Sequence, residues 1–292
     1  MRRTILLLAT MALVLVLVVG GVAASQQREE QSTSSSQSAT SNKSGGDVSI
    51  QSTTVKASFA SGSGPDFFGV KVSDHGNLLS FQSPQGQEAV VAGREGYALC
   101  TGTGFAVGGH DTGDTEENFG APKFSQPNPG KFPLTITRNT TDGALQLKQV
   151  WSKPDATEKD VTVTMTVKNI SNAAIFDIVL SRSGDFDVGT SALDQGARTS
   201  DSVWQWDDPS SATIETSRGG TMLTALTLGA SHETLVEHSN EWAAATREVC
   251  TPGTGIATPT SAQDLAMRVF YNLPGALNVG QSKTVKFEYG RM

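Results

Sequence analysis

The sequence has few of the residues that enzymes use for proton transfer and covalent catalysis. Its 292 residues include four His and two Cys, and it contains no nucleophile-elbow, phosphate-loop or dinucleotide-binding motif. Nothing in it indicates a Ser–His–acid triad. The sequence therefore favours a protein that is not an enzyme, without identifying what the protein binds.

Basic residues are also scarce. The chain carries 22 Lys and Arg against 29 Asp and Glu, which gives a formal net charge of −7, and its basic residues form no cluster. Nucleic acids and anionic membrane surfaces are bound through basic patches. We therefore expect neither as a partner of the mature protein, and we expect a glycan or a protein outside the cell. The sequence gives no oligomeric state.

Long apolar runs are absent except at the N-terminus. Arg2 and Arg3 precede an almost continuous apolar run, residues 5–19, and small residues follow up to Ala24, which is the pattern of a secretory signal peptide over residues 1–24. The alternative is an uncleaved membrane anchor, because the run approaches the ~20 residues that a spanning helix needs. Cleavage would remove both Arg and no acid, so the net charge would become −7 − 2 = −9. We expect an extracellular protein, either secreted or attached to the cell surface through that anchor.

The rest of the chain divides into a polar segment and one domain. Residues 25–52 are rich in Ser, Gln and Thr and cannot bury enough surface to offset their ordering entropy, so we expect a disordered spacer. Residues 53–292 contain no repeat and no second linker, which predicts a single domain. Cys100 and Cys250 are its only cysteines. In an oxidising compartment we expect them to form a disulfide, the alternative being two separate thiols.

Alternation of apolar and polar residues indicates β-strands in the middle of this domain. The stretch VTVTMTVKNISN, residues 161–172, places Val161, Val163, Met165 and Val167 on one face at the two-residue period of a strand, whereas a helix would split them. Val and Thr also favour strands. We expect the strand to end in a turn at its Asn-rich end.

Similar patterns define the expected fold. Three further alternating segments surround this strand, at 132–139, 144–151 and 175–182. Short connections join all four, which predicts an antiparallel meander, and residues 265–273 and 282–290 are predicted to form a closing pair of strands. The sequence thus predicts an all-β fold, a large antiparallel β-sandwich of two packed sheets with about 12–16 strands. Residues 231–248 are the one helix candidate.

Two of these stretches resemble known families. LNVGQSKTVKFEY, residues 277–289, and VTVTMTVKNISN resemble bacterial secreted and surface β-sandwich domains, among them immunoglobulin-like modules and larger mutarotase-like sandwiches. In those families a strand commonly ends in an Asn-centred turn, and a Gly turn precedes the last strand. The resemblance implies the fold and transfers no catalytic residue.

Three acidic residues are candidate calcium ligands. Asp185 and Asp187 alternate just after an expected strand, and Asp194 follows. Clustered carboxylates suit Ca²⁺, which takes about six to eight oxygen ligands. The alternatives are an ion pair between Arg182 and an Asp, with the other acids solvated, and a catalytic or sugar-binding carboxylate. Calcium is the one cofactor that the sequence suggests.

Two tryptophans are candidates for a carbohydrate platform. Trp204 and Trp206 are two residues apart, so they share one face of a strand, and Asp207 and Asp208 follow. Indole rings offer a flat amphipathic surface to a sugar ring, and nearby carboxylates accept hydrogen bonds from its hydroxyls. The alternative is that both rings pack in the core or in a seam between the sheets.

Two His-containing stretches raise the question of a metal. Residues 108–120 are Gly-rich and acidic and include His110; we expect a solvated surface loop, with a metal site as the alternative. The stretch HETLVEH, residues 232–238, lacks the His spacing of helical zinc proteases, because position 236 is Val.

Three function hypotheses follow. The chain is a structural or interaction-type β-sandwich, a carbohydrate-binding module, or a mutarotase-like carbohydrate-active enzyme. The signal peptide, the spacer and the lack of catalytic motifs favour the first. The enzyme hypothesis requires His75, His110, Asp185 and Asp187 to converge in one cleft.

Overall fold

β-Strands make up nearly all the regular structure in the part of the chain that the computed structural model describes. This part comprises residues 54–102, 106–112, 115–188, 194–198, 202–207, 221–227, 233–239, 250 and 266–291. The predicted signal peptide and spacer lie outside these residues. The described residues form three antiparallel sheets and one short 3₁₀ turn, Gly64–Asp66. The predicted all-β sandwich is confirmed, and its 17 strands slightly exceed the expected number. No described helix is long and apolar enough to cross a membrane.

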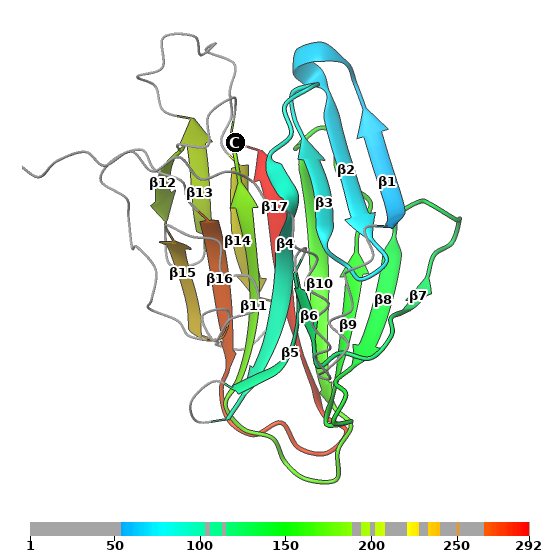
Figure 1. Ribbon diagram of the computed structural model, residues 1–292, viewed down its shortest axis with the longest axis vertical. Coiled ribbons are helices and arrows are strands. Elements are labelled where there is room, and N and C mark those ends of the chain that lie inside the picture. Colours follow the sequence, from blue (N-terminus) through cyan, green and yellow to red (C-terminus); the bar gives the residue numbers. More distant parts are fainter. Residues whose placement is uncertain are drawn as a thin grey trace, which may run out of the picture. The chain divides into compact units, whose positions relative to one another are not determined.

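The three sheets differ in size (Figure 1). The smallest has the order β1 (Val55–Ser61), β2 (Phe68–Ser73) and β3 (Leu78–Gln82). The eight-stranded sheet has the order β12 (Asp194–Arg198), β13 (Ser202–Asp207), β14 (Thr221–Thr227), β17 (Ser282–Arg291), β10 (Asp160–Asn169), β9 (Leu145–Trp151), β8 (Leu134–Asn139) and β7 (Lys123–Ser125). The six-stranded sheet has the order β15 (Glu233–Ser239), β16 (Ala266–Leu273), β11 (Ile178–Phe186), β4 (Val90–Thr101), β5 (Ala106–Thr112) and β6 (Thr115–Glu117).

The inner faces of the sheets share one hydrophobic core. On β10 the side chains of Val161, Val163, Met165 and Val167 are fully buried while the Thr residues between them are partly exposed, as the alternation predicts. Burial of each such side chain stabilises the fold by about 1.5–3 kcal/mol. The same core contains buried apolar side chains from strands of all three sheets. Hydrophobic burial thus holds the layers together.

The predicted meander is correct for three strands and wrong for the fourth. Strands β8, β9 and β10 are neighbours in the eight-stranded sheet, but β11 belongs to the six-stranded sheet, and β10 pairs instead with β17. The predicted closing pair, β16 and β17, is also divided between the two sheets. The connections from β10 to β11 and from β16 to β17 both cross at the bottom of the view in Figure 1. Alternation identifies a strand but does not identify its partner, so the sequence could not show these crossings.

Asn169 ties the two crossing connections together. Its side chain is fully buried, and Nδ2 donates to Ala173 O and to Leu277 O, each at 2.7 Å. Its Oδ1 accepts a hydrogen bond from Ser171 N at 2.9 Å. Ile175 and Leu277 exchange two backbone hydrogen bonds across the same junction. The Asn-rich turn expected after β10 is therefore the point where both crossings are joined.

Removal of the Asn169 side chain should destabilise this junction. We expect Asn169→Ala to lower the free energy of unfolding by on the order of 1–3 kcal/mol, because the carbonyls of Ala173 and Leu277 each lose one hydrogen bond and keep only their second donors, Ser171 Oγ and Ile175 N. Urea denaturation measures the change. The exposed Asn172 serves as the control, and Asn172→Ala should change stability by less than about 0.5 kcal/mol. Equal effects of the two substitutions would contradict the role assigned to Asn169.

The central strand β11 of the six-stranded sheet is buried on both faces. All residues of β11 are buried, and a second small core of Ala98, Cys100, Val179, Cys250 and Phe270 lies on the side of the sheet away from the main core. The predicted Cys100–Cys250 disulfide is present, with 5.6 Å between the Cα atoms. It closes a loop of 150 residues, which in the chain-entropy model stabilises a fold by up to ~5 kcal/mol.

The helix predicted over residues 231–248 is wrong where the structure describes this segment. Residues 233–239 form strand β15, which pairs with β16 in unbroken register from Glu233↔Asn272 to Ser239↔Ala266. A free strand edge on β16 offers a row of backbone hydrogen bonds, and such tertiary pairing overrides a weak local helix preference. Phe176, in the segment 175–182 that was predicted to be a strand, lies in the crossing before β11 and is 56% exposed.

Candidate functional site

The guanidinium of Arg182, on β11, lies at the centre of the molecule and is fully buried. Nη2 and Nε donate to Glu95 Oε1 at 2.7 and 3.1 Å, and Nε also donates to the hydroxyl oxygen of Tyr289 at 2.6 Å. The Tyr289 hydroxyl in turn donates to Glu95. Burial alone would lower the pKa of Arg182, but the Glu95 carboxylate outweighs it and raises that pKa. Arg182 is therefore a permanent buried cation with a dedicated anion.

Further contacts of Arg182 join all three sheets. Nη1 donates to Gln149 Oε1 on β9 at 3.0 Å, and Nη2 donates at 3.2 Å to Gly76 O in the turn between β2 and β3. Its Cζ lies 4.9 Å from the ring centroid of Trp151, on β9, and 5.6 Å from that of Tyr97, on β4. Each such cation–π contact contributes about 0.5–2 kcal/mol. We call this set the Arg182 cluster.

Breaking the Arg182–Glu95 pair should be costly. Arg182→Met leaves the Glu95 carboxylate buried without its cation, so we expect the free energy of unfolding to fall by about 3–5 kcal/mol. The double variant Arg182→Met/Glu95→Gln should lose less than the two single variants together, which a double-mutant cycle by chemical denaturation measures. Lys286→Met is the control, because the 4.0 Å pair of Lys286 with Glu288 is at the surface and should contribute less than about 1 kcal/mol. A loss for Arg182→Met no larger than the control would refute this prediction.

A second charged cluster adjoins the first. His75 lies in the turn between β2 and β3, Asp111 on β5, Glu116 on β6 and Arg138 on β8. The Asp111 side chain is fully buried, that of Arg138 is 1% exposed, and those of Glu116 and His75 are 10% and 12% exposed. Three sheets therefore contribute to this group, which we call the His75 cluster.

Every charged group of the His75 cluster has a partner of opposite charge. His75 Nδ1 lies 2.8 Å from Asp111 Oδ2 and 3.2 Å from Glu116 Oε2. Arg138 donates from Nη1 to Asp111 and from Nη2 to Glu116. Its Nε donates to Gly120 O at 3.0 Å. With His75 protonated, two cations face two anions and the cluster is neutral.

Neutral side chains connect the two clusters. Gln149, whose Oε1 accepts from Arg182, donates from Nε2 to His75 O at 3.4 Å. The Tyr97 hydroxyl donates to His75 O at 2.8 Å and accepts from Arg138 Nη1 at 3.4 Å, while its ring faces Arg182. One continuous polar network therefore runs through the centre of the described molecule.

The composition of the His75 cluster raises the question of a metal ion. His75, Asp111 and Glu116 offer ligand atoms that lie within 4.8 Å of one another. The guanidinium of Arg138, however, already donates to both carboxylates. A divalent cation at this place would face a permanent cation at close range, which costs energy in a buried site. The charges therefore favour an ion-pair quartet over the metal site considered for residues 108–120.

The same residues correct the expected surface loop. Where the structure describes them, residues 108–120 include β5 and β6, which pair as a hairpin, and Asp111 is fully buried. The side chains of Asp111 and Glu116 are held by Arg138 and His75, which are distant in the sequence. Local composition suggested a solvated loop because these partners cannot be recognised from the stretch itself.

The charge of His75 should make stability depend on pH. Burial alone would lower the pKa of His75 from its ordinary 6.5, but the hydrogen bonds to Asp111 and Glu116 outweigh it and raise the pKa to about 9. Because the folded pKa exceeds the unfolded one, the stabilisation is complete below pH ~6.5 and is lost as the pH rises through about 9. We expect the Tm of the wild type to fall more steeply between pH 7 and 10 than that of His75→Gln. Scanning calorimetry at constant ionic strength measures both slopes, and parallel slopes would contradict the prediction.

The candidate calcium ligands do not all lie on one sheet. Asp185 lies near the end of β11, is 3% exposed, and accepts a hydrogen bond from Arg94 Nη1 at 2.8 Å. Asp187 follows β11, and its backbone N–H donates to Ala89 O. Asp194 begins β12 in the eight-stranded sheet. The expected ion pair between Arg182 and an Asp is therefore wrong in its cation: Asp185 pairs with Arg94, and Arg182 binds Glu95. Calcium binding stays a prediction.

The candidate tryptophans lie on β13, next to the edge of the eight-stranded sheet. Trp204 is opposite Ala197 on β12 and Met222 on β14, and Trp206 is opposite Gln195. Their side chains, those of Asp207 and His110, and all of Asp208 lie outside the described part of the chain.

In HETLVEH, residues 233–238 belong to β15, so this stretch is a strand and not the helix of a zinc protease.

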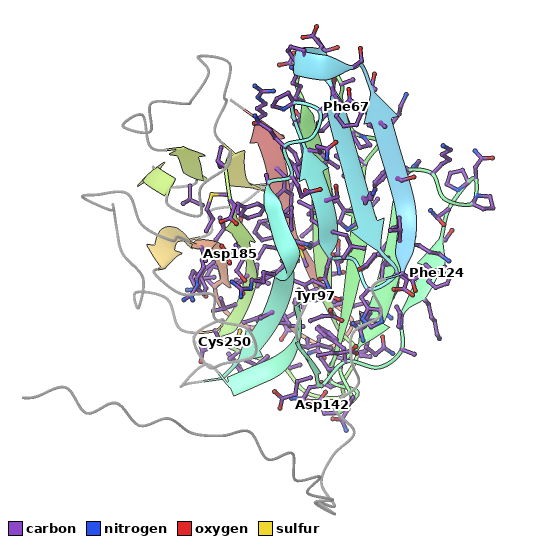
Figure 2. The ribbon with its side chains drawn as sticks, turned by 45° about the horizontal axis from the view of Figure 1, so that its top comes forward. Phe67, Tyr97, Phe124, Asp142, Asp185 and Cys250 are labelled. Carbon is purple, nitrogen blue, oxygen red and sulfur yellow. A yellow bond between two sulfur atoms is a disulfide. The ribbon has the colours of Figure 1, made fainter. Side chains whose placement is uncertain are left out.

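The enzyme hypothesis required His75, His110, Asp185 and Asp187 to converge, and the side chain of His110 lies outside the described residues. His75 lies with Asp111 and Glu116, whereas Asp185 pairs with Arg94. Figure 2 labels Asp185 on β11 and, on the neighbouring strand β4, Tyr97, whose hydroxyl donates to the backbone of His75. The described members of that set thus belong to two different groups.

Glu95, Tyr97 and Arg138 were not singled out from the sequence. Two signals existed. Arg138 continues the inward alternation of Leu134 and Ile136 on β8, and Gln149 interrupts an apolar face on β9. A charged or amide residue at an inward position indicates a buried partner. The sequence does not say which residue that partner is.

Comparisons with known proteins extend the fold assignment. No protein-family model and no curated protein matches the sequence. Among solved structures, a bacterial glucoamylase complexed with acarbose is similar with a TM-score of 0.51 and 7% identity, over 86% of this chain and 34% of that one. A polysaccharide lyase matches with a TM-score of 0.43 and 10% identity, over 80% and 33%. The chain thus spans about a third of each, and the likeness to the glucoamylase concerns the fold alone.

Proposed function

We propose that this chain is an exported, non-enzymatic β-sandwich protein of the interaction type, and that its ligand is a carbohydrate. The observation that carries this proposal is the placement of positions 204 and 206. They alternate along β13 with Val203, whose side chain is fully buried in the main core. The strand lies one place from the edge strand β12. In this proposal Trp204 and Trp206 form the platform and Asp208 supplies an acceptor for sugar hydroxyls, whereas Asp207 alternates onto the Val203 face of the strand.

The fold is compatible with this proposal. The glucoamylase neighbour is a carbohydrate-active enzyme, and the present chain matches only 34% of its length. We infer that the similarity concerns a β-sandwich part of that protein. A β-sandwich of this kind offers sheet faces and edges for a polysaccharide without needing a catalytic centre.

The charged clusters support a non-enzymatic role. A general acid or base must reach the substrate and have a pKa near the working pH. Asp111 and Glu95 are fully buried, and both are neutralised by arginine. His75 is held between two carboxylates. These groups serve the fold in this proposal, and binding takes place at the sheet surface.

Retention on insoluble polysaccharides tests the proposal. We expect the wild type to be retained on at least one of starch, cellulose, chitin or xylan, and Trp204→Ala/Trp206→Ala to bind about tenfold more weakly, because the stacking surface is lost. Trp204→Phe/Trp206→Phe is the matched control and should keep part of the affinity. Circular dichroism checks that each variant is folded. Retention of the wild type on none of the four, or unchanged binding by a folded Ala variant, would overturn the proposal.

A further inference from the structure

A groove separates β1 from the loop between β9 and β10. Its volume is about 460 Å³, within the range of small-molecule sites. The lining residues come from two short segments: Phe59, Ala60 and Ser61 on β1, and Lys153, Pro154, Asp155 and Ala156 in the loop. It therefore combines an aromatic ring, a cation, an anion, a hydroxyl and backbone groups.

The β1 wall is a sheet edge. Strand β1 pairs with β2 on one side only. On its other side, Ser58 N–H donates to Gly130 O at 3.0 Å and Lys56 O accepts from Gln126 Nε2 at 3.1 Å. In an antiparallel strand, alternate residues direct both N–H and C=O to the same side. Ala60 is next in this series, so its peptide groups point away from β2 on the groove side of the strand.

This edge is too short for an added peptide strand. Residues 126–130 already cover the positions before Ala60, and the chain leaves the strand at Gly62, whose φ of +74° begins a turn. Strand addition depends on a row of main-chain hydrogen bonds, and here the exposed row is essentially that of Ala60. A compact ligand with its own donors and acceptors fits this edge better than an extended polypeptide.

The opposite wall is rigid. Asp155 Oδ1 accepts hydrogen bonds from Thr157 N at 2.7 Å and Glu158 N at 3.3 Å, and Asp155 and Asp160 exchange two backbone hydrogen bonds. The adjacent Pro154 is buried. The hydrogen bonds from Thr157 and Glu158 lower the pKa of Asp155, so its carboxylate stays ionised. One oxygen is thus engaged in the turn, which orients the other for a ligand.

We propose that this groove is a second carbohydrate site, which takes a short, neutral, hydroxyl-rich saccharide. This second site rests on the proposed function, because it takes the same class of ligand, a carbohydrate. Sugar hydroxyls both donate and accept, which matches the Lys153 ammonium, the Asp155 carboxylate and the Ala60 peptide groups. Phe59, whose ring lies 6.1 Å from that of Phe68, supplies a fixed apolar surface. Lys153 and Asp155 cancel in charge, so the groove does not select an ionic ligand.

The test compares two charge-neutral double variants. Lys153→Met/Asp155→Asn removes both charges of the groove and keeps the net charge. The substitution at position 155 also keeps a side-chain oxygen that can accept from Thr157 N and Glu158 N. The control, Lys71→Met/Glu288→Gln, makes the same changes on β2 and β17. Binding of neutral oligosaccharides of glucose, mannose, galactose and N-acetylglucosamine is measured by titration calorimetry for each double variant, for the wild type and for Trp204→Ala/Trp206→Ala.

We expect the groove variant to bind at least one saccharide about tenfold more weakly than the wild type, with the control unchanged. That result supports the groove whether or not the Trp204→Ala/Trp206→Ala variant binds normally. Normal binding by the tryptophan variant would overturn the tryptophan platform and leave the groove proposal standing. A loss confined to the tryptophan variant would support the proposed function and overturn the groove. Binding of none of these saccharides by the wild type, or binding of extended peptides in their place, would overturn the groove as well.

Discussion

The ion pair between Arg182 and Glu95 is the interaction on which the rest of the structure depends. Both side chains are fully buried, so neither charge is stabilised by water, and each is compensated by the other. Their remaining hydrogen bonds reach the eight-stranded sheet through Tyr289 and Gln149 and the three-stranded sheet through Gly76 and Leu78. A shift of any sheet would leave a buried charge or polar group without its partner. The pair therefore specifies one arrangement of three sheets that hydrophobic burial alone would tolerate in several.

The same constraint explains the other polar features of the interior. The His75 cluster balances two carboxylates with two cations, and Tyr97 connects it to Arg182. Asn169 performs a similar role at the sheet crossings, with neutral hydrogen bonds. In each case a buried polar group is hydrogen-bonded by residues from different strands or connections. The two charged clusters thus connect strands of all three sheets, and the binding that we propose lies at the sheet edges near β1 and β13.

Alternation predicted the strands well, because one buried face imposes a period of two on the sequence. Strands β8, β9 and β10 and the burial of Val161 to Val167 followed from it directly. Pairing could not be predicted in the same way. The crossing after Asn169 sends β11 to another sheet, and β15 replaces an expected helix because β16 offers it an edge. Both outcomes depend on partners far away in the chain.

The sequence by itself determined the all-β class and the pairing of the two cysteines, because a periodic apolar face and a lone cysteine pair are local or countable properties. Arg138 and Gln149 prove to occupy inward positions of β8 and β9, but the sequence does not identify the partners of their side chains. Only the tertiary structure decided that Arg182 binds Glu95 and that Arg138 lies between Asp111 and Glu116. Charge pairing in a core is set by three-dimensional proximity between strands that are distant in sequence. No local pattern records that proximity.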